Sequence, residues 1–199
     1  MLNEKIKQDF LAILGEELIP AMGCTEPIAL AYASAKGASL LGGEPERIVA
    51  KCSGNIIKNV RCVRIPNSDG MTGIEAACAL GAIAGDPEKS MEVLEGVTQE
   101  GRVKAVRFIR GGCATVEYLE STIPLHFIIE LYGNGNAVTV EVRYSHTNIV
   151  RIEKNGEVIF MTEDLAEAVE VADRSELSVD NIIDFANDIE LDAITPFTN

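Results

Sequence analysis

The feature that constrains the fold most is a run of alternating apolar and polar residues that turn signals interrupt twice. Every second residue is apolar from Leu125 to Leu131 and again from Val138 to Val142, which is the period of a strand with one buried face. Gly133–Asn136 separates these two strands, and Asn155-Gly156, the strongest two-residue hairpin signal, separates a second pair. The pattern predicts an antiparallel sheet within residues 113–160.

The residues before this sheet show mainly a helical period. Leu2–Ile19 carries one apolar stripe, and a second helix, rich in Ala, Gly and Ser, runs from Thr25 to about Leu41. Thr25 is the expected N-cap of that helix. Thr72–Glu75 resembles a capping box for a third helix, which would end near Ala84. Arg47–Cys52 is the single early strand.

The order of elements predicts an α+β protein in which Ala- and Gly-rich helices pack with an antiparallel sheet. Two acidic helices are expected after the sheet, at Glu163–Asp173 and Val179–Glu190. Three segments follow from this order. They are a helical segment (1–96) with a Gly-Cys-Thr-Glu-Pro motif, a sheet segment (97–161) and an acidic helical segment (162–199) that is expected to continue into a further C-terminal half.

Charge and cysteine content exclude several classes of function. The net charge of −14 argues against a nucleic-acid partner, because phosphate binding needs clustered Lys and Arg. The apolar runs are short and broken by charges, which argues against a membrane span. The five cysteines lack the paired spacing of a disulfide framework, and the first twenty residues lack a secretory cleavage site. A cytoplasmic location with reduced thiols is expected.

The most informative motif is Gly23-Cys24-Thr25-Glu26-Pro27. A cysteine directly before a helix meets unpaired backbone N–H groups and the positive end of the helix dipole. Both favour the thiolate, which is the form that attacks, accepts a proton or binds iron. The alternative is a buried cysteine near a helix end with no chemical role.

Four blocks of the chain resemble a known family. The blocks read AMGCTEPIA (Ala21–Ala29), SGNIIKN (Ser53–Asn59), GIE (Gly73–Glu75) and HTNIV (His146–Val150). Their order resembles that of the cysteine desulfidases, relatives of the iron–sulfur L-serine dehydratase alpha chain.

The resemblance implies a β-elimination. Such enzymes use a [4Fe–4S] cluster held by three cysteines, with one iron open to the substrate as a Lewis acid. A base removes the α-proton of L-cysteine, sulfide departs, and the enamine breaks down to pyruvate and ammonia. L-serine dehydration is the close alternative. Cys24 would be either a cluster ligand or the thiolate that moves the proton, and the sequence leaves both roles open.

The resemblance also assigns roles to other residues of this chain. Asn55 and Lys58 could bind the substrate carboxylate, although Asn after Gly is often a turn residue and a lone Lys is often only solvated. His146 could shuttle protons or could simply satisfy backbone groups, whereas His126 is expected to be structural. The expected catalytic residues are Cys24, Glu26 and His146; the expected substrate-binding residues are Thr25, Ser53, Asn55 and Lys58; the expected metal ligand is Cys24.

The chain departs from the family pattern in its length and its cysteines. Members of that family are about twice as long, and their later half supplies further cysteines. The other four cysteines here form no close ligand pair, so a cluster would need cysteines from outside this chain. The expected partners are a small amino acid and a second copy in a homodimer that covers an exposed apolar patch. The hypothesis from another class is a non-catalytic module for substrate binding, regulation or oligomerisation.

Overall fold

A computed structural model of the protein describes residues 2–18, 21, 23–162 and 172–197. The chain divides into two compact units, one of Ala21–Leu165 and one of Met1–Pro20 together with Ala166–Asn199. In the described ranges no helix is long and apolar enough to cross a membrane.

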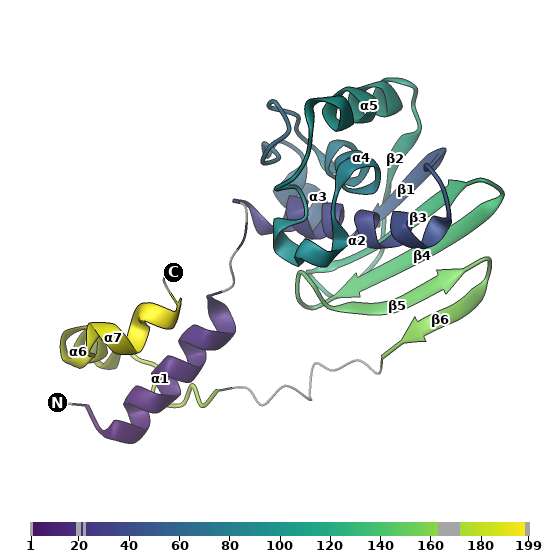
Figure 1. Ribbon diagram of the computed structural model, residues 1–199. Helices are drawn as coiled ribbons and strands as arrows, with labels where there is room; N and C mark the ends of the chain where they lie inside the picture. The colour runs from purple at the N-terminus through teal and green to yellow at the C-terminus, as the bar shows by residue number, and fades with distance from the viewer. Residues whose placement is uncertain (1, 19–20, 22, 163–171, 198–199) are drawn as a thin grey trace. The chain divides into compact units, whose positions relative to one another are not determined.

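The larger unit is built on one six-stranded sheet with the order β2-β1-β3-β4-β5-β6 (Figure 1). The strands are β1 (Arg47–Cys52), β2 (Ala114–Tyr118), β3 (His126–Gly133), β4 (Asn136–Arg143), β5 (Ile149–Lys154) and β6 (Glu157–Met161). The two predicted hairpins are confirmed: β3 pairs antiparallel with β4 and β5 pairs antiparallel with β6. Phe127, Ile129 and Leu131 are buried on one face of β3, as their alternation predicts.

Strand β1 changes the predicted extent and direction of the sheet. It lies between β2 and β3, antiparallel to β3 but parallel to β2. The prediction of an antiparallel sheet confined to residues 113–160 is therefore too narrow, because β1 comes from the predicted helical segment. The α+β class is confirmed, with a sheet that is antiparallel except at the β1–β2 pair.

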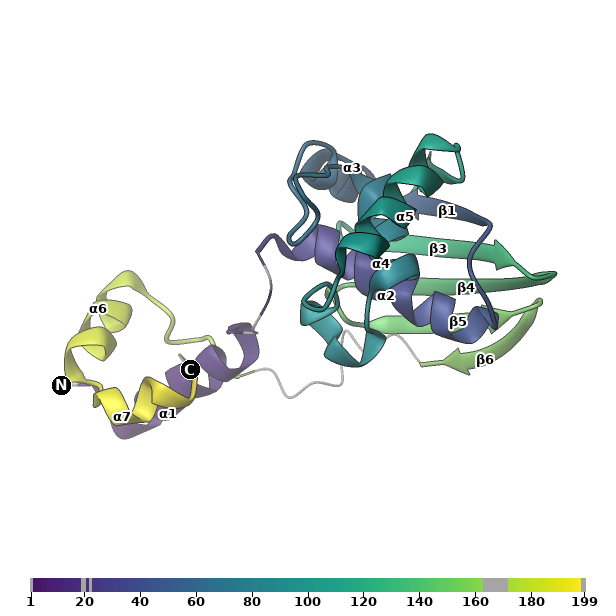
Figure 2. The same ribbon diagram turned by 45° about the horizontal axis from the view of Figure 1, so that its top comes forward.

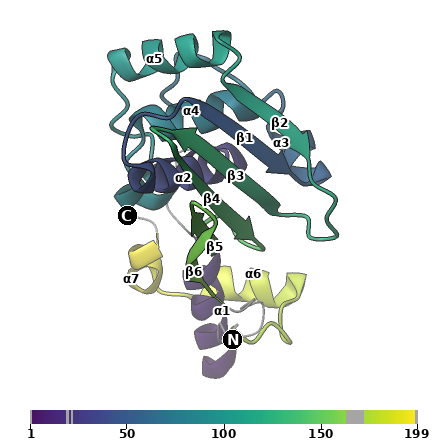
Figure 3. The same cartoon turned by 90° about the vertical axis from the view of Figure 1, so that its right-hand side faces the viewer.

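Two small-residue helices cover one face of this sheet, as Figures 1 and 3 show. They are α2 (Thr25–Leu41) and α4 (Ile74–Ala84), and their small side chains bring the two backbones close together. A Cβ atom added to Gly81 of α4 would fall on the Ala31 carbonyl oxygen of α2. The expectation of a central Ala-rich helix is confirmed, since most of α2 is buried.

Shorter elements surround the helix pair. They are α3 (Gly54–Val60), the 3₁₀ segment η1 (Pro87–Glu92) and α5 (Gln99–Arg110), which packs on α4 (Figure 2). The chain directly after β1 thus forms a short helix. The predicted capping box at Thr72 is wrong: Gly73, at φ +93°, is the N-cap of α4 and no side chain caps it. Thr72 instead forms a β-bridge with Arg64.

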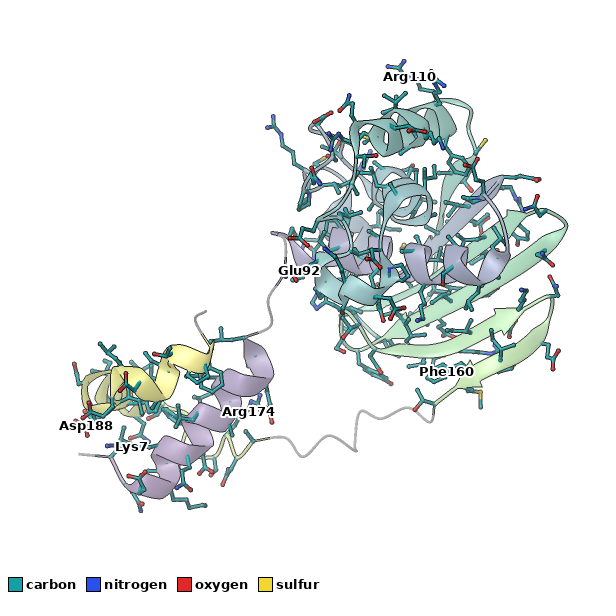
Figure 4. The ribbon with its side chains drawn as sticks, in the orientation of Figure 1. Lys7, Glu92, Arg110, Phe160, Arg174 and Asp188 are labelled. Atoms are coloured by element: carbon teal, nitrogen blue, oxygen red, sulfur yellow. The ribbon has the colours of Figure 1, made fainter. Side chains whose placement is uncertain are left out.

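Edge strand β6 is exposed along its whole length. Four of its five residues are large and apolar and each is more than 40% exposed: Val158, Ile159, Phe160 and Met161. Figure 4 labels Phe160 on this strand. The expected exposed apolar patch is therefore present at a sheet edge, the part of a sheet most prone to pair with another chain.

The smaller unit consists of helices. They are α1 (Glu4–Glu17), α6 (Val179–Asp188), α7 (Leu191–Ile194) and the 3₁₀ segment η2 (Thr195–Phe197). Phe10 and Phe185 pack with ring centroids 5.2 Å apart, which joins α1 to α6. The helix predicted at Glu163–Asp173 falls largely outside the described residues.

Candidate functional site

The loop before α2 places a cysteine at the start of a buried helix. Gly23 adopts a left-handed φ of +82°, and a Cβ atom there would lie 3.3 Å from Pro66. Cys24 follows as the N-cap, so the prediction that Thr25 caps the helix is wrong by one residue. The side chain of Cys24 makes no capping hydrogen bond and is free to contact other groups.

Glu26, in the first turn of α2, is the centre of a hydrogen-bonded cluster. Its Oε2 atom accepts a hydrogen bond from Cys24 Sγ at 3.3 Å and from Thr25 Oγ1 at 3.4 Å. Its Oε1 atom accepts one from Asn59 Nδ2 at 3.0 Å. Asn59 lies on α3, so two elements distant in sequence fix one carboxylate. Sequence reasoning missed Asn59, although it ends the SGNIIKN block.

The cluster keeps Glu26 ionised. Burial alone would raise the pKa of Glu26, but its own backbone N–H and the Cys24 and Asn59 donors outweigh that effect. The pKa of Glu26 therefore lies below its ordinary value. A carboxylate with this many donors is a stable negative charge at neutral pH.

The same carboxylate keeps Cys24 protonated. Burial is the largest cause that raises the pKa of Cys24, and the hydrogen bond and charge of Glu26 raise it further. The backbone N–H groups of Thr25 and Glu26 act in the opposite direction, as a helix start should, but they are outweighed. The prediction of an ionised Cys24 is therefore wrong, because it considered the helix start and neither burial nor the neighbouring carboxylate.

His146 affects this cluster through its charge. It lies in the loop between β4 and β5 and is partly buried. Burial lowers the pKa of His146, and the charge of Glu26 opposes that shift in part. The structure thus joins two of the predicted catalytic residues, Cys24 and Glu26, by a hydrogen bond, while His146 interacts with Glu26 through its charge alone.

The four predicted substrate-binding residues occupy different surroundings. Thr25 belongs to the Glu26 cluster. Ser53 is 2% exposed and donates to the Pro124 carbonyl at 2.6 Å, which gives it a structural role. Asn55 and Lys58 are exposed on α3, the helix that carries Asn59, and their side chains have no partner within the described ranges.

His126 has the structural surroundings that its position in a strand predicts. It is 8% exposed, and its ring nitrogens lie 2.8 Å from Ser121 Oγ and 2.9 Å from Glu141 Oε1. Arg143 also pairs with Glu141, at 2.6 Å. These contacts leave His126 as part of a buried polar network on β3 and β4.

The cysteines of this chain do not fit an iron–sulfur cluster. Cys52 and Cys78 are buried in the core, and burial raises the pKa of both thiols, that of Cys78 to about 12. Cluster ligands are thiolates, and burial at these two positions disfavours the thiolate form. Cys62 is exposed and Cys113 is half-buried. Among the residues that the structure describes, no three His, Cys, Asp or Glu side chains come together as ligands.

Two clefts are lined in part by residues of α2. One of about 400 Å³ is lined by Tyr32 of α2, by Thr147 and Asn148, which follow His146, and by Phe160 of β6. A larger one of about 580 Å³ lies between α2, α4 and α5 and does not include Cys24. The cleft of about 580 Å³ and the cluster of Cys24 and Glu26 are thus at different places in the larger unit.

Comparisons with known proteins give a consistent set of relatives. A protein of Desulfitobacterium hafniense is 42% identical over 193 residues, and a protein of Treponema denticola is 39% identical over 197 residues. A third, from Lachnoclostridium phytofermentans, is 42% identical over 184 residues. These relatives are all UPF0597 proteins.

The matches cover 92–98% of this chain but only 44–46% of the UPF0597 proteins themselves. The chain therefore spans about half the length of the curated relatives that it matches. No protein-family model matches the chain, and no solved structure matches it. The name UPF0597 states no activity, so the resemblance to cysteine desulfidases stays a prediction.

Proposed function

We propose that this chain is part of an enzyme that eliminates sulfide from L-cysteine and yields pyruvate and ammonia. The observation that carries the proposal is the hydrogen bond from Cys24 to Glu26 at the start of α2, with His146 of the β4–β5 loop near enough for its charge and that of Glu26 to affect each other's pKa. A thiol, a carboxylate and an imidazole in one neighbourhood are a set of groups that can move protons.

Glu26 is suited to receive the ammonium group of an amino acid. It is ionised and partly buried, so a cation placed beside it gains more than at an exposed carboxylate. Such an ammonium would compete with the Cys24 thiol for Oε2 and would offset the negative charge that disfavours the thiolate. Substrate binding would thereby lower the pKa of Cys24 and prepare it to act as a base.

The proton balance of the elimination then follows. The thiol proton of Cys24 passes to His146, whose lowered pKa keeps the imidazole neutral and able to accept it. The Cys24 thiolate takes the α-proton, the Cβ–S bond breaks with its electron pair on sulfur, and a Cα=Cβ double bond forms. The resulting enamine becomes an imine, which water hydrolyses to pyruvate and ammonium.

Lys58 and Asn55 are the proposed ligands of the substrate carboxylate. Both are exposed on α3, whose Asn59 holds Glu26, and neither side chain has a partner in the described part of the chain. Asn55 and Asn59 are four residues apart and so share one helix face. A carboxylate bound on that face would orient the ammonium toward Glu26.

The [4Fe–4S] cluster of the proposed enzyme would need thiolates beyond the described residues, since the cysteines here do not fit it. Those thiolates could belong to the portion of full-length relatives that this chain does not match. The same dispersion of cysteines favours a second candidate function, a substrate-binding or oligomerisation module without chemistry of its own.

The test is sulfide and pyruvate release from L-cysteine, with L-serine as the competing substrate. It is carried out anaerobically on this chain and on the full-length protein that contains it. We expect activity in the full-length protein, a loss of at least about 100-fold in Cys24→Ala, and near-normal activity in the matched control Cys62→Ala. Pyruvate from L-serine alone would assign the dehydratase reaction instead. Unchanged turnover in Cys24→Ala would refute the proposal, and binding of L-cysteine without turnover would favour the module.

A further inference from the structure

A cleft of the larger unit lies away from Cys24, between the C-terminal parts of α2 and α4 and the second half of α5. Its volume is about 580 Å³, within the range of about 300–1,000 Å³ that small-molecule sites occupy. Its apolar lining includes Ala35, Ala38, Ala82, Ile83, Pro87 and Phe108. Because most of these side chains are small, they leave an open apolar surface at the bottom of the cleft, which forms its floor.

Two cations of α5, Lys104 and Arg107, lie at the rim of this cleft. Lys104 of α5 is paired with Glu44 at 3.4 Å and with Glu100 at 3.3 Å. Arg107, one turn further along α5, is exposed and lines the cleft. Its guanidinium has no hydrogen-bond or ionic partner in the ranges that the structure describes. The two cations and the two carboxylates balance in total charge, but Arg107 is the cation left open to a ligand beside the apolar lining.

We propose that this cleft binds an amphipathic monocarboxylate, with its carboxylate on Arg107 and its hydrocarbon body on the floor between α2 and α4. A guanidinium binds a carboxylate through two parallel N–H···O bonds. The hydrocarbon body would remove apolar surface of Ala38, Ala82 and Phe108 from water. Because Lys104 is held by two carboxylates, Arg107 is the rim cation left open to a ligand in the described ranges, and one guanidinium suits one carboxylate.

Arg107 also borders a second, smaller cleft of about 260 Å³, which Arg102 and Arg110 line as well. The two clefts can be told apart because Arg110 belongs to the smaller one only. Arg110 extends outward from α5 (Figure 4) and, like Arg107, is exposed without a side-chain partner in the described ranges. It is therefore a matched control on the same helix.

The test is calorimetric titration of the full chain with decanoate and with decanol, which share a hydrocarbon body but differ in charge. We expect decanoate to bind at one site and decanol to bind at least about tenfold more weakly. Arg107→Gln should weaken decanoate binding about tenfold and leave decanol unchanged. Ser39→Trp, which fills the cleft from an exposed position, should abolish binding of both, and Arg110→Gln should change nothing.

Urea unfolding of each variant separates lost binding from lost folding, and the exposed Arg107→Gln keeps the test decisive if Ser39→Trp does not fold. Three results would overturn the proposal: no decanoate binding, equal binding of decanoate and decanol, or equal losses in Arg107→Gln and Arg110→Gln. None of these results depends on Cys24, so the proposed elimination stands or falls separately.

Discussion

Replacing Glu26 with glutamine tests whether the carboxylate keeps Cys24 protonated. The substitution keeps the size and shape of the side chain and removes only its charge, which lies 3.3 Å from the Cys24 sulfur. Even with the dielectric constant of water, a charge at that distance opposes ionisation of the thiol by about 1.3 kcal/mol. Glu26→Gln should therefore raise the thiolate fraction of Cys24 about eightfold at a pH below its pKa.

The effect on reactivity is smaller than the effect on ionisation. A thiolate of lower pKa is also a weaker nucleophile, and this offsets about half of the gain on a logarithmic scale. We expect Cys24 to be alkylated about threefold faster in Glu26→Gln than in the wild type at pH 8. In the wild type, labelling of Cys24 should still increase above pH 9.0, the ordinary thiol value, because its pKa is raised.

The assay is pulse alkylation with iodoacetamide followed by mass spectrometry of the Cys24 peptide. The exposed thiol of Cys62 is the internal reference for reagent and time. Glu75→Gln is the matched control, because Glu75 is also in the first turn of a helix but lies in α4. An unchanged or slower rate at Cys24 in Glu26→Gln would refute the reasoning and would leave burial as the cause of the raised Cys24 pKa.

Three further predictions concern the framework of the larger unit. Asn59→Ala removes the hydrogen bond to Glu26 Oε1 and should lower the free energy of unfolding by about 1–2 kcal/mol in urea denaturation; no change would mean that α3 does not hold the carboxylate. Gly81→Ala places a methyl group on the Ala31 carbonyl and should destabilise by about 3 kcal/mol or more, whereas Gly96→Ala, with open space around it, should stay within about 0.5 kcal/mol. Ile159→Lys puts a charge on the exposed β6 edge and should reduce concentration-dependent self-association in sedimentation velocity; equal association in both proteins would exclude β6 as the contact.

Local signals predicted most of the secondary structure. The alternation in β3 and β4 and the turn at Asn155-Gly156 each act over a few residues, so the sequence contains the whole cause. The strand Arg47–Cys52 was predictable for the same reason. Its place beside β2 was not, because parallel pairing depends on the helices that connect the strands and not on a pattern inside either one.

The sequence predicted which residues belong to the candidate site, with the exception of Asn59, but it did not predict the direction of the Cys24 pKa shift. Cys24 and Glu26 are two residues apart, and His146 belongs to a recognisable block. The direction of the Cys24 pKa was missed because it depends on burial and on where the Glu26 side chain turns. Asn59 was missed because an amide on a short helix has no local sequence signal for the carboxylate that it will meet.

The position of β1 has a consequence for how the protein is made. Ile48 and Cys52 are fully buried, yet their pairing partner Phe127–Leu131 leaves the ribosome much later. A nascent chain therefore carries β1 with both edges unpaired until β2 has been translated, and with one edge unpaired until β3 follows, a period in which chaperone binding or aggregation competes with folding. For the same reason we expect polypeptides cut between β1 and β2 to remain unfolded separately and to regain structure only when both pieces are mixed.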